Sequence, residues 1–337
     1  MNKFLLLAAL CLLLGSQAAA NIIYVSPNGT GNGSDWQQAA SFKQALASAR
    51  ADDEIWLTAG TYLPGNDRQA TFLIPSGVKV FGSFIGTETA RHQRNLQIGT
   101  ETILSGNIGT PSQEDNVFTV VTFRNAASTT TLADLTIAHG YAMAMEYTDG
   151  LATCGAAIYN DGRGGVSSPT LRNLRIINNR SRNGAGIYND GRRQGQASPI
   201  IIGCTFQGNK ADFKGGAIYN NGTRGQSSPR VQKCNFVNNT ANNGGAIINF
   251  GNGGTSSPLI ADCNFTRNTA ITAGCAIFNV IQENGQADPI LQDVRFQDNS
   301  CKLGGDVSSN VNNAPVAQQN DNNNGFRERT VAAANKK

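Results

Sequence analysis

Hydrophobic positions in the central part of the chain recur with a period of 29 to 31 residues. Each repeat opens at a proline, and the spacings are 30, 30, 29 and 31 residues for Pro169, Pro199, Pro229, Pro258 and Pro289. A period of this length is typical of solenoids, in which each repeat forms one coil. Each coil buries its apolar face only against its neighbours, so the sequence predicts one elongated domain.

Counted from the proline, apolar residues occupy the second, fifth and seventh positions of each repeat. The three columns are Leu171, Ile201, Val231, Ile260 and Leu291; Leu174, Cys204, Cys234, Cys263 and Val294; and Ile176, Phe206, Phe236, Phe265 and Phe296. The fifth and seventh positions alternate as a strand does, and the step of three leaves room for a bend between two short strands. A further strand is predicted at Ile187, Ile218, Ile247 and Ile277. Equal positions of successive coils are expected about 4.8 Å apart.

Asparagines form two more columns. The first contains Asn179, Asn209, Asn239, Asn268 and Asn299, and the second contains Asn160, Asn189, Asn220, Asn249, Asn279 and Asn310. Stacked amides can hydrogen-bond along a ladder, and asparagine tolerates the left-handed backbone that a sharp corner needs. We therefore interpret both columns as structural and expect them to mark corners of the coil.

The repeat resembles a known pair of motifs. Phe206-Gln207-Gly208-Asn209 and Gly215-Gly216-Ala217-Ile218 are similar to the FxxN and GGA[ILV] repeats of the chlamydial polymorphic membrane proteins and related bacterial surface proteins. The pair recurs in register, with Cys275 replacing the second glycine of one copy and Asp306 replacing the alanine of the last. The resemblance covers residues 131–310 and implies an all-β fold, a right-handed parallel β-helix (solenoid) of the pectin-lyase-like type. Such β-helices usually belong to secreted or surface-exposed proteins.

The segments outside the regular repeats have different compositions. Residues 1–20 read as a secretory signal peptide, with Lys3 before an apolar segment and Ala18-Ala19-Ala20 as the cleavage site. Residues 21–130 are expected to form a cap and irregular first coils, including a capping helix from the N-cap Ser41 through Arg50. The cap would cover the open end of the solenoid. The polar residues 311–337 are predicted to be disordered.

The charge of the chain is nearly balanced, with 27 Lys and Arg against 23 Asp and Glu. This excess is too small to predict binding to nucleic acid or to an anionic membrane. The apolar part of the signal peptide is too short to span a bilayer, so no transmembrane segment is expected in the mature chain. We expect a monomer.

Six cysteines follow the signal peptide, and an even number in an exported protein raises the possibility of a disulfide framework. The repeat argues against it for Cys204, Cys234 and Cys263, which share one inward column. Side chains on neighbouring parallel strands point the same way, which suits disulfide geometry poorly, so buried thiols are predicted. Cys154, Cys275 and Cys301 lie elsewhere in the repeat, and the sequence does not pair them.

Catalytic motifs are hard to find. His92 and His139 fall in different early segments, with no serine or cysteine beside them that suggests an activated nucleophile. The glycines follow the solenoid period and form no phosphate-binding or dinucleotide motif.

One set of loops carries candidate chemistry. The loops after the second asparagine column contain Asp161, Arg163, Asp190, Arg192, Arg193 and Arg224. In register, Asp161 is expected near Asp190, and the arginines are expected to stack in pairs, Arg163 with Arg192 and Arg193 with Arg224. Asn-Asp-Gly is also ordinary turn chemistry, and loop arginines keep a solenoid soluble.

The resemblance adds a functional interpretation of these loops. Polysaccharide lyases with this fold bind acidic sugar chains through carboxylate-held calcium and use an arginine near the sugar C5 proton. By that comparison Asp161 and Asp190 would hold Ca²⁺, and the arginines would meet uronate carboxylates. Three alternatives stay open: a structural turn, passive glycan binding, and lyase or epimerase catalysis. Catalytic residues are not assigned, and no cofactor other than Ca²⁺ is suggested.

A fold alone does not determine function, because one scaffold supports many activities. The leading hypothesis is an exported, non-catalytic β-helix protein of the bacterial surface or extracellular space that makes adhesive or glycan contacts. Its partner would be an extracellular polysaccharide or a cell-surface molecule. The alternative is a pectate-lyase-like enzyme acting on acidic glycans along one face of the helix.

Overall fold

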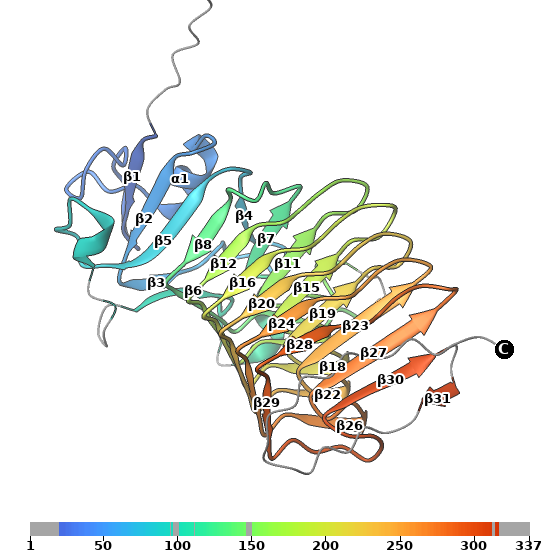
Figure 1. The fold of residues 1–337 in the computed structure, drawn as a ribbon. Helices are drawn as coiled ribbons and strands as arrows, with labels where there is room; N and C mark the ends of the chain where they lie inside the picture. Colours follow the sequence, from blue (N-terminus) through green and yellow to red (C-terminus); the bar gives the residue numbers. More distant parts are fainter. Residues whose placement is uncertain are drawn as a thin grey trace, which may run out of the picture.

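The computed structural model describes residues 20–94, 96, 101–110, 112–145, 150–311 and 314–316. The predicted signal peptide lies outside these residues apart from Ala20, and most of the predicted tail lies outside them as well. The described chain winds into a parallel β-helix that runs from the blue end to the red end of Figure 1. The predicted fold class is therefore confirmed.

The strands of the described residues form four sheets, numbered here in the order in which a coil visits them. Sheet I contains β1 (Ile22–Val25), β2 (Glu54–Thr58), β5 (Lys79–Phe84), β8 (Thr131–Ala133), β12 (Thr170–Arg172), β16 (Ile200–Ile202), β20 (Arg230–Gln232), β24 (Leu259–Ala261) and β28 (Ile290–Gln292). Sheet II contains β3 (Gly60–Tyr62), β6 (Thr102–Ser105), β9 (Thr136–Ala138), β13 (Arg175–Ile177), β17 (Thr205–Gln207), β21 (Asn235–Val237), β25 (Asn264–Thr266) and β29 (Arg295–Gln297).

The other two sheets complete each coil. Sheet III contains β10 (Tyr141–Ala142), β14 (Arg180–Asn183), β18 (Lys210–Lys214), β22 (Thr240–Asn243) and β26 (Thr269–Ala273). Sheet IV contains β4 (Phe72–Ile74), β7 (Val121–Arg124), β11 (Ile158–Asp161), β15 (Ile187–Asp190), β19 (Ile218–Asn221), β23 (Ile247–Asn252), β27 (Ile277–Gln282), β30 (Val307–Val311) and β31 (Ala314–Val316). Strand β31 pairs antiparallel with β30, whereas the other strand pairs of the described residues are parallel.

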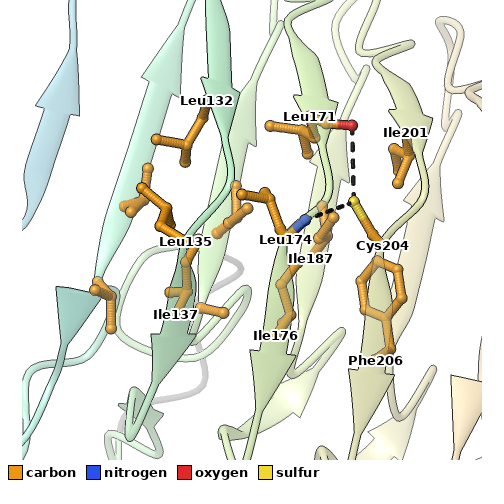
Figure 2. Close-up of a cluster of buried hydrophobic side chains, with 14 of the residues drawn as sticks. Leu132, Leu135, Ile137, Leu171, Leu174, Ile176, Ile187, Ile201, Cys204 and Phe206 are labelled. Carbon is orange, nitrogen blue, oxygen red and sulfur yellow. Dashed lines mark hydrogen bonds between the residues drawn. The ribbon is translucent and has the colours of Figure 1, made fainter. Parts of the chain in front are cut away.

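The apolar columns lie in the core as the repeat predicts. Phe206, Phe236 and Phe265 are fully buried, and their rings stack face to face with centroids 4.8 and 4.5 Å apart. These separations match the spacing of parallel strands, so the stacking follows directly from the register. Figure 2 shows the same columns earlier in the helix, where Leu174 and Cys204 occupy equivalent places on neighbouring coils.

Both asparagine ladders are present and buried. In the first, the Nδ2 group of Asn209 donates to Oδ1 of Asn239 at 3.1 Å, and the same bond recurs along the column. Three details of the prediction are wrong. The left-handed residue at the corner comes immediately before the ladder, as at Asn238 with φ of 53°, and the second ladder lies inside the strands of sheet IV. Register also places Ser309, and not Asn310, next to Asn279.

The two glycines of the GGA motif serve different needs. Gly215 has a φ of 65°, a left-handed conformation that side chains rarely adopt. Gly216 has no such angle, but a β-carbon there would collide with the carbonyl oxygen of Gly245 on the next coil. The motif therefore marks a tight turn with close backbone approach between sheets III and IV.

The N-terminal end carries a helix where the sequence predicts one. Helix α1 (Phe42–Ser48) is capped by Ser41, whose hydroxyl oxygen accepts from the backbone N–H of Gln44 in a capping box. Phe42 and Ala45 form its buried face, and the helix ends at Ser48, before the predicted end at Arg50. Two 3-10 turns, η1 (Arg91–Gln93) and η2 (Gln113–Asp115), lie in the insertions of the early coils.

The cysteine column is buried and unpaired, as expected. Cys204, Cys234 and Cys263 are free thiols with no exposed surface, and burial raises the pKa of the Cys234 thiol well above its usual value. The pairing that the sequence does not resolve is a disulfide between Cys275 and Cys301. It joins the turn before β27 to the last coil of the regular repeat.

Candidate functional site

The six candidate residues lie at one margin of sheet IV and in the loops that follow it. Strands β11 and β15 end at Asp161 and Asp190, which are direct register neighbours, and β19 ends at Asn221 in the same row. Each is followed by a glycine and a turn, and the loops stack from coil to coil. The expected proximity of the two aspartates is therefore observed.

Each aspartate is held by the arginine two residues later. The guanidinium of Arg163 donates from Nε and Nη2 to the two oxygens of Asp161, both at 2.9 Å. Arg192 holds Asp190 in the same way, with both distances 2.8 Å. The backbone N–H groups of both arginines also point to the carboxylates. Bidentate pairs of this kind are the strongest carboxylate–guanidinium contacts, so each Asp-Gly-Arg segment forms a self-contained turn.

A tyrosine from the preceding coil completes the partners of Asp190. The hydroxyl of Tyr159 donates to Oδ2 of Asp190 at 2.6 Å, and Nε of Arg163 lies 3.5 Å from the same oxygen. The Asp190 side chain has no exposed surface. Its oxygens are occupied by donors from two coils, which is how a protein stabilises a buried carboxylate.

The electrostatics of the site keep Asp161 and Arg163 charged and the hydroxyl of Tyr159 neutral. Burial by itself would raise the pKa of Asp161, but the hydrogen bonds and positive charge of Arg163 outweigh it, so the pKa lies below its usual value. The hydrogen bond to Asp161 raises the pKa of Arg163 further, and burial raises the pKa of Tyr159, helped by the negative charge of Asp190. Neither Arg163 nor Tyr159 is therefore poised to accept or release a proton near neutral pH.

The remaining two arginines are exposed at the tip of the loops. Arg193 and Arg224 have φ values of 59° and 49°, and they occupy equivalent left-handed turn positions on adjacent coils. The backbone N–H of Gln194 donates to the carbonyl of Arg224, which brings the two loops together. Arg224 pairs with Glu283 at 3.1 Å, where both side chains are more than half exposed. These two residues present positive charge to solvent.

The carboxylates do not fit a calcium site. Calcium takes six to eight oxygen ligands, and Asp161 and Asp190 would each have to give up a bidentate arginine to supply any. Across the part of the chain that the structure describes, no three His, Cys, Asp or Glu side chains come together as a metal site. We therefore derive no step through Ca²⁺.

Sequence analysis missed a row of tyrosines on the outer face of sheet IV. Tyr159, Tyr188 and Tyr219 follow the inward isoleucines of their strands and form a second apolar cluster with Cys154. The rings of Tyr159 and Tyr188 stack with centroids 5.4 Å apart, and all three side chains are buried. The repeated Ile-Tyr-Asn motif was the available signal, but strand alternation alone predicts that these residues face solvent.

A serine lies beside one histidine, which the sequence did not predict. The hydroxyl of Ser105 is 3.3 Å from Nδ1 of His139, and the same oxygen accepts from the backbone N–H of Asn107. Ser105 is buried, and no carboxylate among the described residues bonds to the histidine. The pair therefore lacks the accessible nucleophile and oriented base of a hydrolase.

One cavity of the described residues lies away from these groups. Its volume is about 220 Å³, and its lining consists of Gln69, Thr71, Phe118, Thr119, Leu151 and Ala152. This lining contains no acid, histidine, cysteine or lysine. The cavity thus offers no group for proton transfer or nucleophilic attack.

Comparison with known proteins supports the sequence repeat. The model of the Chlamydia polymorphic membrane protein repeat matches residues 203–221, which include most of the two motifs quoted from the sequence. Among solved structures, the crystal structure of pectate lyase Pel9A is similar over 85% of this chain and 79% of its own, with 14% identity and a TM-score of 0.43. No curated protein sequence matches the chain. The chain is thus a parallel β-helix with polymorphic-membrane-protein-type repeats.

The described part of the chain contains no helix with the length and apolar character required to cross a bilayer.

Proposed function

We propose that this chain is a secreted or surface-exposed β-helix protein that works without catalysis, as a scaffold for adhesion or glycan contact. The repeat that matches residues 203–221 is named for membrane proteins of Chlamydia, which supports a surface location. The predicted signal peptide supports export by the general secretory route. A bacterial outer membrane or the extracellular space is the proposed location.

The single observation that carries the non-catalytic reading is the state of Asp190. A lyase of this architecture would need a carboxylate free for a cation and a basic group free to take a proton. Asp190 is fully buried and is held by Arg192 and Tyr159. Its oxygens and the guanidinium of Arg192 are both engaged in the turn, so their evident role is to fix the loop.

The exposed arginines support a contact role for the same loops. Arg193 and Arg224 stand on adjacent coils at the loop tips, and guanidinium groups recognise carboxylates and sulfates of glycans in bidentate fashion. Polysaccharide lyase or epimerase activity is the alternative. Such an enzyme would form a measurable product, whereas an adhesion protein would only be retained on the polysaccharide.

One experiment separates the two functions. The mature protein is incubated with polygalacturonate and with alginate, with and without Ca²⁺, while absorbance of unsaturated product and retention on the immobilised polymers are followed. We expect retention without absorbance. An absorbance increase that disappears in R192A would overturn the non-catalytic proposal in favour of a lyase. If the assay shows neither product nor retention, glycan contact is overturned and a protein partner remains as the target.

The loop arginines are tested in the same assay. R193A/R224A should weaken retention and leave the thermal unfolding transition unchanged, because both side chains are exposed. R172A/R230A is the matched control, since it removes two exposed arginines from the outer face of sheet I. Equal losses in the two double variants would show that the loops have no particular role.

A further inference from the structure

Sheet III presents a flat outer face whose side chains follow from strand alternation. In each strand the second residue points into the core, and these inward residues are Ala142, Ser181, Ala211, Ala241 and Ala270, all nearly or fully buried. The residues before them point outward and are register neighbours, in the order Tyr141, Arg180, Lys210, Thr240 and Thr269. Neighbouring members of this row lie about 4.8 Å apart.

The positive charge of this face is gathered on two adjacent strands. Strands β14 and β18 carry Arg180, Arg182, Lys210 and Lys214 against one carboxylate, Asp212. Arg180 donates to that carboxylate at 3.2 Å. Lys210 is exposed and belongs to no ion pair formed by described residues. Lys210 thus keeps a positive charge that no described carboxylate pairs.

Arg182 and Lys214 are held in place by their surroundings. Arg182 donates from Nε and Nη2 to the carbonyl of Ala144, at 3.2 and 2.8 Å. The ammonium group of Lys214 lies 4.7 Å from the centroid of the Phe250 ring on the next coil. Such fixed positions reduce the side-chain entropy that would be lost when an anion binds.

Aromatic side chains lie among these charges. The Tyr141 ring is 5.9 Å from the guanidinium of Arg180. Strand β18 has one residue more than β14 between the pairs Ser181–Ala211 and Asn183–Lys214. Such a bulge redirects a side chain, and Phe213, inside it, is 40% exposed. An exposed phenylalanine between cations offers an apolar surface next to charge.

We propose that the outer face of sheet III binds an acidic polysaccharide whose chain crosses strands β14 and β18. Anionic groups of the polymer, carboxylate or sulfate, pair with Arg180 and Lys210, and the C–H face of a sugar ring lies on Phe213. A periodic polymer suits a face whose binding groups repeat from strand to strand. Nucleic acid suits this face less well, because its affinity for proteins rests on many phosphate contacts. The face offers only four cations on strands β14 and β18.

This proposal rests on the proposed function, because it assigns glycan contact to a second face and names its class. The probes are immobilised polygalacturonate and dextran sulfate, and the readout is the dissociation constant of the full mature protein at low salt. Charge reversal in K210E should weaken binding about tenfold, and neutral K210Q should weaken it less. R230E is the matched control, because it reverses one exposed charge on sheet I.

The outcomes separate the two proposals. The sheet III site is supported if K210E and F213A bind the polysaccharides more weakly while R230E binds as the parent does, with all three variants folded. Equal effects of K210E and R230E would show that only net charge matters and would overturn it, while glycan contact elsewhere survives. Stronger binding to single-stranded DNA than to either polysaccharide would also overturn it. Failure of the parent protein to bind any acidic polymer would overturn both proposals.

Discussion

The hydroxyl of Tyr159 donates a 2.6 Å hydrogen bond to the carboxylate of Asp190 on the next coil. Tyr188, one coil further along, accepts a 2.7 Å hydrogen bond from the amide of Asn221. The same geometry therefore joins successive coils outside the core, first through a charged acceptor and then through a neutral donor. These bonds tie the outer face of sheet IV together where the asparagine ladder ties its inner face.

Removing the first of these bonds should destabilise the protein. Y159F leaves the ring stack intact but takes one donor from a fully buried carboxylate, which we expect to lower the free energy of unfolding by about 1 to 3 kcal/mol. Urea unfolding measures the change. Y24F is the matched control, because that ring packs on Trp36 and Trp56 and its hydroxyl has no hydrogen bond among the described residues. Equal losses in both variants would contradict the role of the bond.

The paired aspartate should make stability depend on pH. Because the pKa of Asp161 in the folded protein lies below its usual value of 3.8, folding favours the ionised carboxylate. Its contribution is present above about pH 5 and is lost as the pH falls through the folded pKa. The difference in unfolding free energy between the parent and D161N should therefore shrink in acid.

A double-mutant cycle identifies the cause of that pH dependence. Arg163 is the main group that lowers the pKa of Asp161 against the effect of burial, with a smaller contribution from Arg124, so the acid-dependent part of the D161N effect should shrink or reverse in an R163A background. Urea titrations of the four proteins between about pH 3 and 7 provide the comparison. A pH dependence of equal size in the R163A background would mean that another group is responsible.

The phenylalanine stack gives the most severe test of the register. F236D places a charge between Phe206 and Phe265 in the core, and the loss of apolar burial alone is worth about 3 to 5 kcal/mol. We expect no cooperative unfolding transition at the parent temperature. N235D, the adjacent outward residue of the same strand, should behave as the parent, because its side chain already accepts a hydrogen bond from Asn264. A stable F236D protein would refute the assigned register.

The sequence was sufficient to predict burial wherever the position of a residue within the repeat determines its surroundings. Phe236 and Asn239 recur at fixed intervals from a proline, so their inward columns and ladder could be predicted before any coordinates. The burial of Tyr188 could not be predicted in this way. The alternation of inward and outward residues along a strand places Tyr188 on the solvent side, and only the neighbouring turn and side chains cover it. Long-range packing outside the repeat core has no signal in strand alternation.

The candidate site shows the same division. Register alone brings Asp161 beside Asp190, as predicted. The engagement of each carboxylate by its own arginine depends on the local turn, which folds the chain back over two residues. Sequence therefore placed the two carboxylates side by side but gave no sign that a bidentate arginine holds each of them.

The disulfide at the end of the repeat should stabilise the last coil selectively. Cys275 occupies the second glycine position of its turn, and Cys301 occupies the inward position of sheet III, where other coils have alanine or serine. The bond spans 26 residues, for which chain-entropy arguments give about 3 kcal/mol. Reduction should therefore increase hydrogen exchange in β28 and β29 while the core around Phe206 stays protected. In C275S/C301S, reductant should have no effect, because none of the other cysteines of the described residues forms a disulfide. A reductant effect of equal size in that variant would contradict the assignment of stability to this bond.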